Sequence, residues 1–163
     1  MQFINLNPIP LDELDRRILD CLQQDNSLTN QDLADRVHAS PPTCLRRVRR
    51  LVETGVIDKQ VAILAPEKLG STLTAIVEIT LDVQAAERLN AFEQLMQAEA
   101  AVLQCYRVSP GPDFLLIVQV CDIPSYHALV HRAFTGAANV RNVRTFFSTH
   151  RSKFETRITL PPV

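Results

Sequence analysis

The feature that most constrains this chain is an arginine-rich run from residue 40 to 51, Ser-Pro-Pro-Thr-Cys-Leu-Arg-Arg-Val-Arg-Arg-Leu. Ser40 is suited to cap a helix and Pro41 to its first turn, where a missing N–H costs little. A helical wheel groups the apolar side chains on one side: Leu45, Val48, Leu51, Val52 and, nearby, Cys44. The opposite side carries Thr43, Arg46, Arg47 and Arg50. The run therefore predicts a helix that anchors one face in a small core, with a basic face that suits either solvent or a polyanion.

The residues before this run favour the polyanion. Residues 27–37 predict a shorter helix capped at Thr29 or Asn30, and a tight turn at 38–40 joins it to the basic helix. A further helix begins near residue 11, with an apolar stripe of Leu14, Ile18, Leu19 and Leu22. Two helices, a short turn and a basic helix form a helix-turn-helix unit, which places its last helix in the DNA major groove.

The amino-terminal turns of such a helix reach the base edges, and later residues meet phosphates. We expect base contacts from Pro42, Thr43, Arg46 and Arg47, and phosphate contacts from Arg49 and Arg50. Residues 55–60 and 61–64 are expected to form a small wing that brings Lys59 near the DNA backbone. The expected DNA-binding set is Ser40, Pro42, Thr43, Arg46, Arg47, Arg49, Arg50 and Lys59.

Charge is distributed unevenly along the 163 residues, although the net charge is only −1. Residues 40–60 hold five basic side chains against two acidic ones, and residues 11–36 hold seven acidic against three basic. A nucleic-acid binder needs positive charge only on its contact face. We therefore expect the acidic helices to point away from the phosphates.

Other classes of protein have weak support in the sequence. The amino terminus lacks the features of a signal peptide and no apolar run approaches a membrane span, so we expect a cytoplasmic protein. The cysteines at 21, 44, 105 and 121 form no C-x-x-C pair and are expected to be reduced, buried thiols. His127 and His131 have helical i, i+4 spacing, but without further ligands they favour a solvated face over a metal site. We expect no cofactor and no metal.

The second half of the chain changes from helical to alternating patterns. The expected elements are strands at 73–81, 102–109, 114–120 and 140–151, with helices at 85–98 and from 124. The order β-α-β-β-α-β predicts a ferredoxin-like domain, so the chain as a whole is α+β. The third strand is apolar on both faces, and Phe146 and Phe147 point opposite ways in the fourth. A sheet that is apolar on both sides predicts a partner over its open face, most simply a second copy.

The chain resembles the Lrp/AsnC family of transcriptional regulators, and its leucine-responsive branch most of all. The resemblance rests on Leu11-Asp12-x-x-Asp15-x-x-Ile18-Leu19, Asp32-Leu33-Ala34, Ser40-Pro41, Cys44-Leu45-x-Arg47-Val48-x-Arg50-Leu51, Gly55-Val56-Ile57, Leu69-Gly70 and Val108-Ser109-x-x-x-Asp113-Phe114-Leu115-Leu116. It implies a winged helix-turn-helix domain at 11–60, a linker at 61–70 and a ferredoxin-like effector and oligomerisation domain at 71–160. It also implies a regulator of double-stranded DNA, modulated by a small molecule such as an amino acid, and dimers that assemble into octamers.

In this family the effector lies near the loop between the second and third strands. The residues implied here are Val108, Gly111, Asp113, Phe114, Thr149 and Ser152. Pro110 stands where the family has glycine, and with Pro112 it stiffens the loop and removes donors. Asp113 is expected to hold a ligand amine or else to cap the turn. An enzymatic alternative is a sirohaem-decarboxylase-like protein of the same fold, which would not need four arginines on the third helix; we therefore expect no enzyme.

Overall fold

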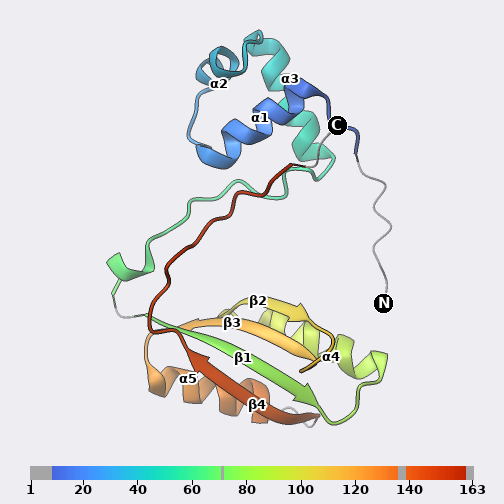
Figure 1. The fold of residues 1–163 in the computed structure, drawn as a ribbon, viewed down its shortest axis with the longest axis vertical. Coiled ribbons are helices and arrows are strands. Elements are labelled where there is room, and N and C mark those ends of the chain that lie inside the picture. The colour runs from blue at the N-terminus through green and yellow to red at the C-terminus, as the bar shows by residue number, and fades with distance from the viewer. Residues whose placement is uncertain (1–8, 71, 136–138, 161–163) are drawn as a thin grey trace. The chain divides into compact units, whose positions relative to one another are not determined.

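A computed structural model describes residues 9–70, 72–135 and 139–160 of the chain. The chain divides into two compact units. The first combines the chain up to Ile63 with the residues from Lys153 onwards, and the second comprises Leu64–Ser152. Figure 1 shows a group of helices in the first unit and a sheet with its helices in the second.

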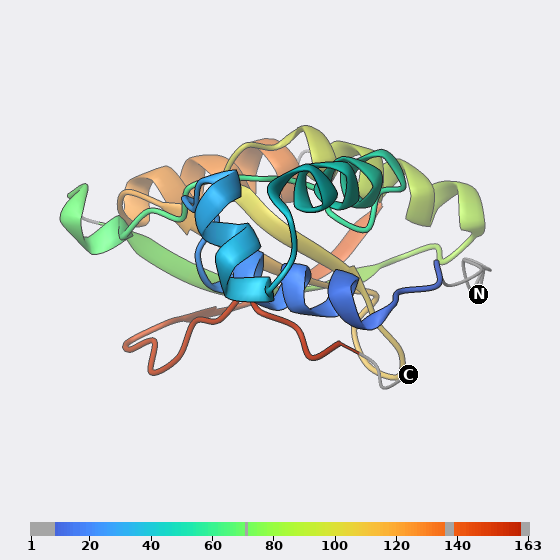
Figure 2. The same cartoon turned by 90° about the horizontal axis from the view of Figure 1, so that it is seen from above.

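The first unit contains α1 (Glu13–Gln24), α2 (Asn30–Val37) and α3 (Pro41–Glu53). Each helix begins at a side-chain cap, because Asp12, Thr29 and Ser40 each accept a hydrogen bond from a first-turn amide. The three helices pack around one small core (Figures 1 and 2). Its buried side chains are Ile18, Leu19, Leu33, Ala34, Val37, Cys44 and Leu51.

The segment after α3 differs from the expected wing. Gly55 adopts φ +73°, which favours glycine, and the helix ends there in a turn with a hydrogen bond from the Ile57 amide to the Leu51 carbonyl. Residues 58–65 then run on without forming a strand. A strand pair needs a partner ladder, and this segment has none within its own unit. The wing expected at 55–64 is therefore absent from the described chain.

Residues 153–160 lie on the first unit, although the sequence placed them at the end of the second domain. The Ile158 backbone exchanges two hydrogen bonds with the Gln23 side chain, at 2.8 Å and 3.2 Å. Arg157 forms an ion pair with Asp20 at 3.2 Å, and Leu160 packs against the helical core. The carboxy-terminal segment thus contributes to the helix-turn-helix unit.

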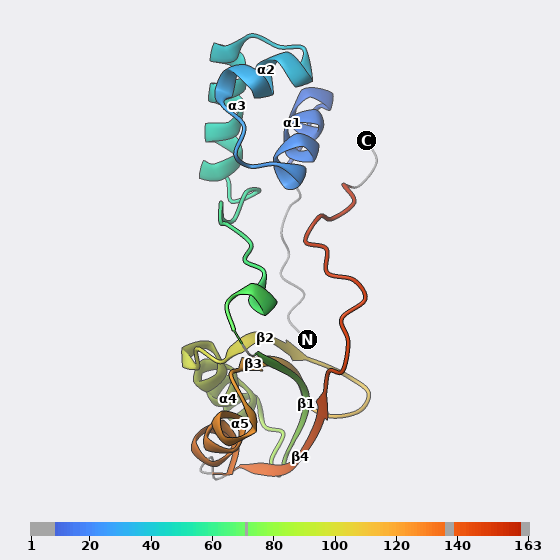
Figure 3. The same ribbon diagram turned by 90° about the vertical axis from the view of Figure 1, so that its left-hand side faces the viewer.

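The second unit is a ferredoxin-like sandwich. Its elements after the short turn η1 (Pro66–Lys68) are β1 (Leu73–Leu81), α4 (Ala86–Ala98), β2 (Val102–Arg107), β3 (Phe114–Val120), α5 (Ile123–Leu129), the π-helical η2 (Val130–Thr135) and β4 (Val140–Phe147). The antiparallel sheet has the order β2-β3-β1-β4. Helices α4 and α5 lie on one face of it (Figure 3). The α+β class and the βαββαβ order are confirmed, while β4 ends at Phe147, four residues earlier than expected.

Helices cover one face of the sheet (Figure 3), while the open face carries apolar side chains beside the ion pair of Arg144 with Glu78. Ala75, Val77 and Ile79 of β1 alternate into the core under the helices and are fully buried. On the open face Ile76 pairs with Ile117 on one side and Phe146 on the other. Tyr106 and Leu103 of β2 are also more than half exposed. The expected apolar open face is therefore present.

The cysteines differ in part from expectation, whereas His127 and His131 are both exposed, as expected. Only Cys44 is buried, where burial raises the pKa of its thiol; Cys21 and Cys105 are half-buried and Cys121 is exposed. Within residues 9–70, 72–135 and 139–160, no three His, Cys, Asp or Glu side chains gather as a metal site. None of the helices in these ranges is long and apolar enough to cross a membrane.

Candidate nucleic-acid interface

The position of α3 is set by the turn before it. His38 ends α2 in the left-handed region, at φ 54° and ψ 51°, and its amide hydrogen-bonds back to the last turn of that helix. The Asn30 side chain then donates to the Pro41 carbonyl at 2.9 Å, which links the start of α2 to the start of α3. The two helices of the motif are therefore held at both the turn and their amino-terminal ends.

The buried face of α3 is rotated relative to the sequence-based wheel. Cys44 and Leu51 are fully buried and Val48 packs against them, whereas Leu45 and Val52 are 50% and 45% exposed. Positions 44, 47, 48 and 51 form the inner stripe at i, i+3, i+4 and i+7. The prediction that Leu45 and Val52 lie in the core is wrong, and the rotation turns Arg47 towards α1.

Two arginines of α3 are bound by the acidic start of α1. Arg47 Nη1 donates to Asp12 Oδ2 at 2.6 Å and to Asp15 Oδ1 at 3.2 Å, and Arg50 Nη2 lies 2.5 Å from Asp15 Oδ2. The Asp15 side chain is only 1% exposed, so its charge depends on these partners. Asp12 and Asp15 therefore face the inner side of the basic helix, a pairing that the sequence did not predict.

The same contacts shift the pKa values of Asp12 and Arg47. A hydrogen bond from the Asp15 amide, followed by the Arg47 guanidinium, lowers the pKa of Asp12. The Asp12 carboxylate in turn raises the pKa of Arg47. Both residues remain charged at neutral pH, and the charge of Arg47 is compensated within the fold.

The outer face of α3 presents a different stripe. Pro42, Leu45, Arg46 and Arg49 are exposed and recur at i, i+3, i+4 and i+7. Neither Arg46 nor Arg49 forms an ion pair with a residue that the structure describes. The helical wheel predicted a buried Leu45, so the sequence did not identify it as a candidate contact residue. We call these four residues the outer stripe.

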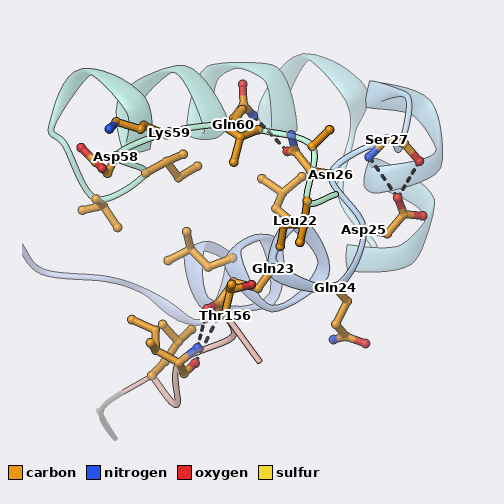
Figure 4. Close-up of a pocket in the computed structure, with 18 residues that line it drawn as sticks. Leu22, Gln23, Gln24, Asp25, Asn26, Ser27, Asp58, Lys59, Gln60 and Thr156 are labelled. Atoms are coloured by element: carbon orange, nitrogen blue, oxygen red, sulfur yellow. Dashed lines mark hydrogen bonds between the residues drawn. The ribbon is translucent and has the colours of Figure 1, made fainter. Parts of the chain in front are cut away.

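The remaining expected DNA contacts lie at the two ends of the motif. Ser40 Oγ and Thr43 Oγ1 are 2.8 Å apart, and Ser40 also caps the helix through the Thr43 amide. Lys59 lies beside Asp58 on the extended segment after α3, at the edge of a groove in the first unit (Figure 4). Ser40 and Thr43 thus adjoin the outer stripe at the start of α3, while Lys59 stands outside any wing.

That groove is largely apolar and has a volume of about 910 Å³. One wall comes from α1 and another from the segment after α3, where Gln60 donates to Asn26 at 3.2 Å. The carboxy-terminal segment closes part of the groove, where Gln23 hydrogen-bonds to the Ile158 backbone (Figure 4). None of the expected effector residues lines it.

The expected effector loop, residues 108–113, is tied to the end of β1. Asp113 Oδ2 accepts a hydrogen bond from the Leu81 amide at 2.7 Å, and the Asp113 amide donates to the Ile79 carbonyl at 2.8 Å. The Val108 amide closes the loop on the Asp113 carbonyl, and Gly111 has φ +127°, a conformation that favours glycine. Asp113 therefore has a structural role across strands rather than the expected cap of its own turn.

The other expected effector residues do not gather at this loop. The Phe114 side chain is fully buried and its ring lies 4.7 Å from that of Phe92, so it belongs to the core. Phe147, the end of β4, pairs with Ala75, whereas Phe114 pairs with Ile79 at the other end of β1. Thr149 and Ser152 thus follow the opposite end of the sheet, about 13 Å or more along the strands.

Comparison with known proteins decides the family. Residues 11–58 match the winged helix-turn-helix DNA-binding family, and residues 74–158 match the Lrp/AsnC ligand binding domain. This chain belongs to the Lrp/AsnC family of transcriptional regulators. It is 35% identical to the leucine-responsive regulatory protein of Escherichia coli K12 over 92% of both chains. It is 37% identical to an uncharacterized HTH-type transcriptional regulator of Haemophilus influenzae, over 92% of this chain and 89% of the relative.

Solved structures agree with this membership. An AsnC family regulator from Agrobacterium tumefaciens has a TM-score of 0.85 and 35% identity, covering 91% of this chain and 97% of that one. A Neisseria meningitidis transcriptional regulator solved with L-Met has a TM-score of 0.85 and 27% identity, covering 92% and 97%. The Lrp/AsnC resemblance expected from the sequence is thereby confirmed, as is a transcription regulator with a DNA-binding and a ligand-binding domain.

Proposed function

We propose that this Lrp/AsnC regulator reads DNA through the outer stripe of α3. The proposal rests on one observation, that Arg46 and Arg49 project from the second helix of a helix-turn-helix without a partner among the described residues. Arg46 lies within the first turns, where side chains reach base edges, and an arginine reads guanine best. Leu45 and Pro42 supply apolar contacts of the kind that thymine methyl groups make.

The remaining expected residues take supporting roles in this proposal. Arg49 lies one turn further along and suits a phosphate, as does Lys59 on the following segment. Ser40 and Thr43 position the start of the helix and offer hydroxyls to the backbone. Arg47 and Arg50 stabilise the packing of α3 on α1 by contacting Asp15, and we do not assign them to base recognition.

Quantitative binding to an operator selected from random sequence tests the assignment. Arg46→Ala is expected to lower specific affinity by about 1–3 kcal/mol. Arg49→Ala is expected to weaken specific and non-specific binding alike and to reduce the salt slope by about one. The matched control is Arg88→Ala, an exposed arginine on α4. Equal binding by Arg46→Ala and the control would overturn the assignment of α3 as the reader.

We further propose that the second unit binds an amino acid and that a second copy takes part in the site. The Neisseria relative crystallised with L-Met supports the ligand class. Loop 108–113 and residues 149–152 lie past opposite ends of one sheet, so they meet only if they come from different copies. A homodimer over the open sheet face, assembling further to an octamer, is the proposed state.

A thermal-shift screen of the twenty amino acids tests the ligand proposal, because a ligand that binds only the native state raises its melting temperature. Asp113→Asn keeps an oxygen that can accept from the Leu81 amide but removes the charge a ligand amine would need. We expect this variant to melt like the wild type and to lose the ligand-induced shift. A shift that survives in Asp113→Asn would remove this carboxylate from the site.

We propose no enzymatic activity for the chain. Four arginines on α3, two of them exposed, fit a DNA-binding helix and have no role in a tetrapyrrole decarboxylase. The absorbance spectrum of the purified protein tests this, and a bound tetrapyrrole would contradict it.

A further inference from the structure

The Asp12 carboxylate, at the start of α1, contacts an arginine of α3, the helix that we propose reads DNA. Its Oδ2 lies 2.6 Å from Arg47 Nη1, and its side chain is 50% exposed. Arg47 follows Arg46 on α3, and its side chain is 24% exposed although the guanidinium is turned towards α1. The inference drawn from this contact rests on the proposed function, in which α3 meets DNA.

The two acidic residues of this cluster have different surroundings. Asp15 is buried and contacts both Arg47 and Arg50, so its contacts belong to the fold. Asp12 uses Oδ1 to cap α1, where it accepts from the Asp15 amide at 2.9 Å. Its Oδ2 takes no part in that cap and contacts Arg47 instead.

A carboxylate oxygen and a phosphate oxygen make the same kind of contact with a guanidinium. Non-specific affinity for DNA grows with the number of cations available to phosphates, since each neutralised phosphate releases counterions. A cation that is already paired with a carboxylate contributes less, and the carboxylate itself repels a phosphate.

We propose that Asp12 is a specificity-determining residue that withholds Arg47 from DNA phosphates. On arbitrary sequence, Arg47 stays on Asp12 and adds little to binding. On an operator, the contacts of the outer stripe fix the helix in the groove, and a well-placed phosphate can then displace Oδ2. Asp12 thus lowers non-specific affinity more than specific affinity and widens the ratio between them.

The test is Asp12→Asn, since asparagine caps helices as well as aspartate and keeps the acceptor for the Asp15 amide. Binding is measured to a duplex of random sequence and to the selected operator, between 50 and 200 mM salt. We expect tighter non-specific binding, a salt slope steeper by about 0.9 and a smaller specificity ratio. Arg47→Ala in the Asp12→Asn background is expected to cancel the gain.

The matched control is Asp122→Asn, which makes the same change at the cap of α5, where Asp122 accepts from the Ser125 amide at 2.8 Å. If Asp12→Asn and Asp122→Asn show the same slope and ratio, the inference is overturned. Asp12→Ser, which also keeps a capping oxygen, gives the same test should the asparagine variant fold poorly. Loss of operator binding in Arg46→Ala together with an unchanged Asp12→Asn would reject this role of Asp12 while leaving the proposed function in place.

Discussion

Arg46 and Arg47 are neighbours of one residue type, yet the fold gives them different surroundings. One helical step of about 100° separates an exposed side chain from one that contacts two aspartates. The sequence predicted a basic helix correctly, because cap and periodicity are local signals. It did not predict which arginines stay exposed, since that depends on how α3 rotates against α1. The buried carboxylate of Asp15, which contacts Arg47 and Arg50, comes from α1, so no local pattern in α3 indicates this contact.

Asp15 is expected to stabilise the first unit through this cluster. Removing one partner of a buried ion pair leaves the others uncompensated, so Asp15→Asn should destabilise the unit by about 3 kcal/mol. Hydrogen exchange of the α1 and α3 amides measures the change. Asp58→Asn, at an exposed position of the same unit, is the control. Equal protection in the two variants would show that the cluster contributes little.

The response of this unit to acid follows from the pKa of Asp12. That pKa is lowered from 3.8, chiefly by the Asp15 amide and then by Arg47. A lowered folded pKa means that the stabilisation is complete above pH 3.8 and is lost as pH falls through the folded value. We therefore expect constant protection of α1 from pH 7 to about pH 4 and a loss below it. In Asp12→Asn the loss should be smaller, and an identical acid profile would contradict this.

At the scale of elements, the periodic segments were predictable and the irregular ones were not. The alternation of β1 predicted correctly that Ala75, Val77 and Ile79 are buried. The winged helix-turn-helix family was predicted correctly, but residues 58–65, expected to contribute wing strands, form no strand. The carboxy-terminal segment was assigned to the second domain because it follows β4 without a break. Its position on α1 depends on the Gln23 side chain, far away in sequence, which no local signal indicates.

Gln23 is expected to hold the carboxy-terminal segment in place. Gln23→Ala removes both bonds to Ile158, so the amide of Ile158 should exchange with solvent markedly faster. Gln24→Ala is the matched control, since the neighbouring Gln24 bonds only within α1, to the Asp20 carbonyl. Mass-spectrometric hydrogen exchange of the last residues reads out both. Equal exchange in the two variants would show that the segment is held by other contacts.

For the whole molecule, the most important feature is the open apolar face of the sheet, which we propose is covered by a second copy. Ile76 lies between Ile117 and Phe146 across the strands, and Arg144 stacks over Phe146 at 4.8 Å. The sequence predicted this face, because β3 carries apolar residues at successive positions and a strand turns successive side chains to opposite faces. The sequence could not show that the effector residues divide between opposite ends of the sheet, since this follows from strand register.

A charge on this face should prevent a second copy from covering it. Ile76→Lys places an ammonium group among apolar neighbours and near Arg144, so a covering copy would have to desolvate an added positive charge. We expect the mass in solution to fall to that of a single chain, with the fold retained in circular dichroism. Val83→Lys, at an exposed position after β1, should keep the wild-type mass. An unchanged mass for Ile76→Lys would place the interface elsewhere.

The most direct test of the central claim, that the outer stripe of α3 reads DNA, is a loss-of-contact measurement. Wild type and Arg46→Ala are each titrated against operators in which one base pair at a time is replaced. We expect Arg46→Ala to become indifferent to one base pair in each half-site, whereas the wild type loses about 1–3 kcal/mol when that pair is replaced. The same base-pair profile in both proteins would contradict it.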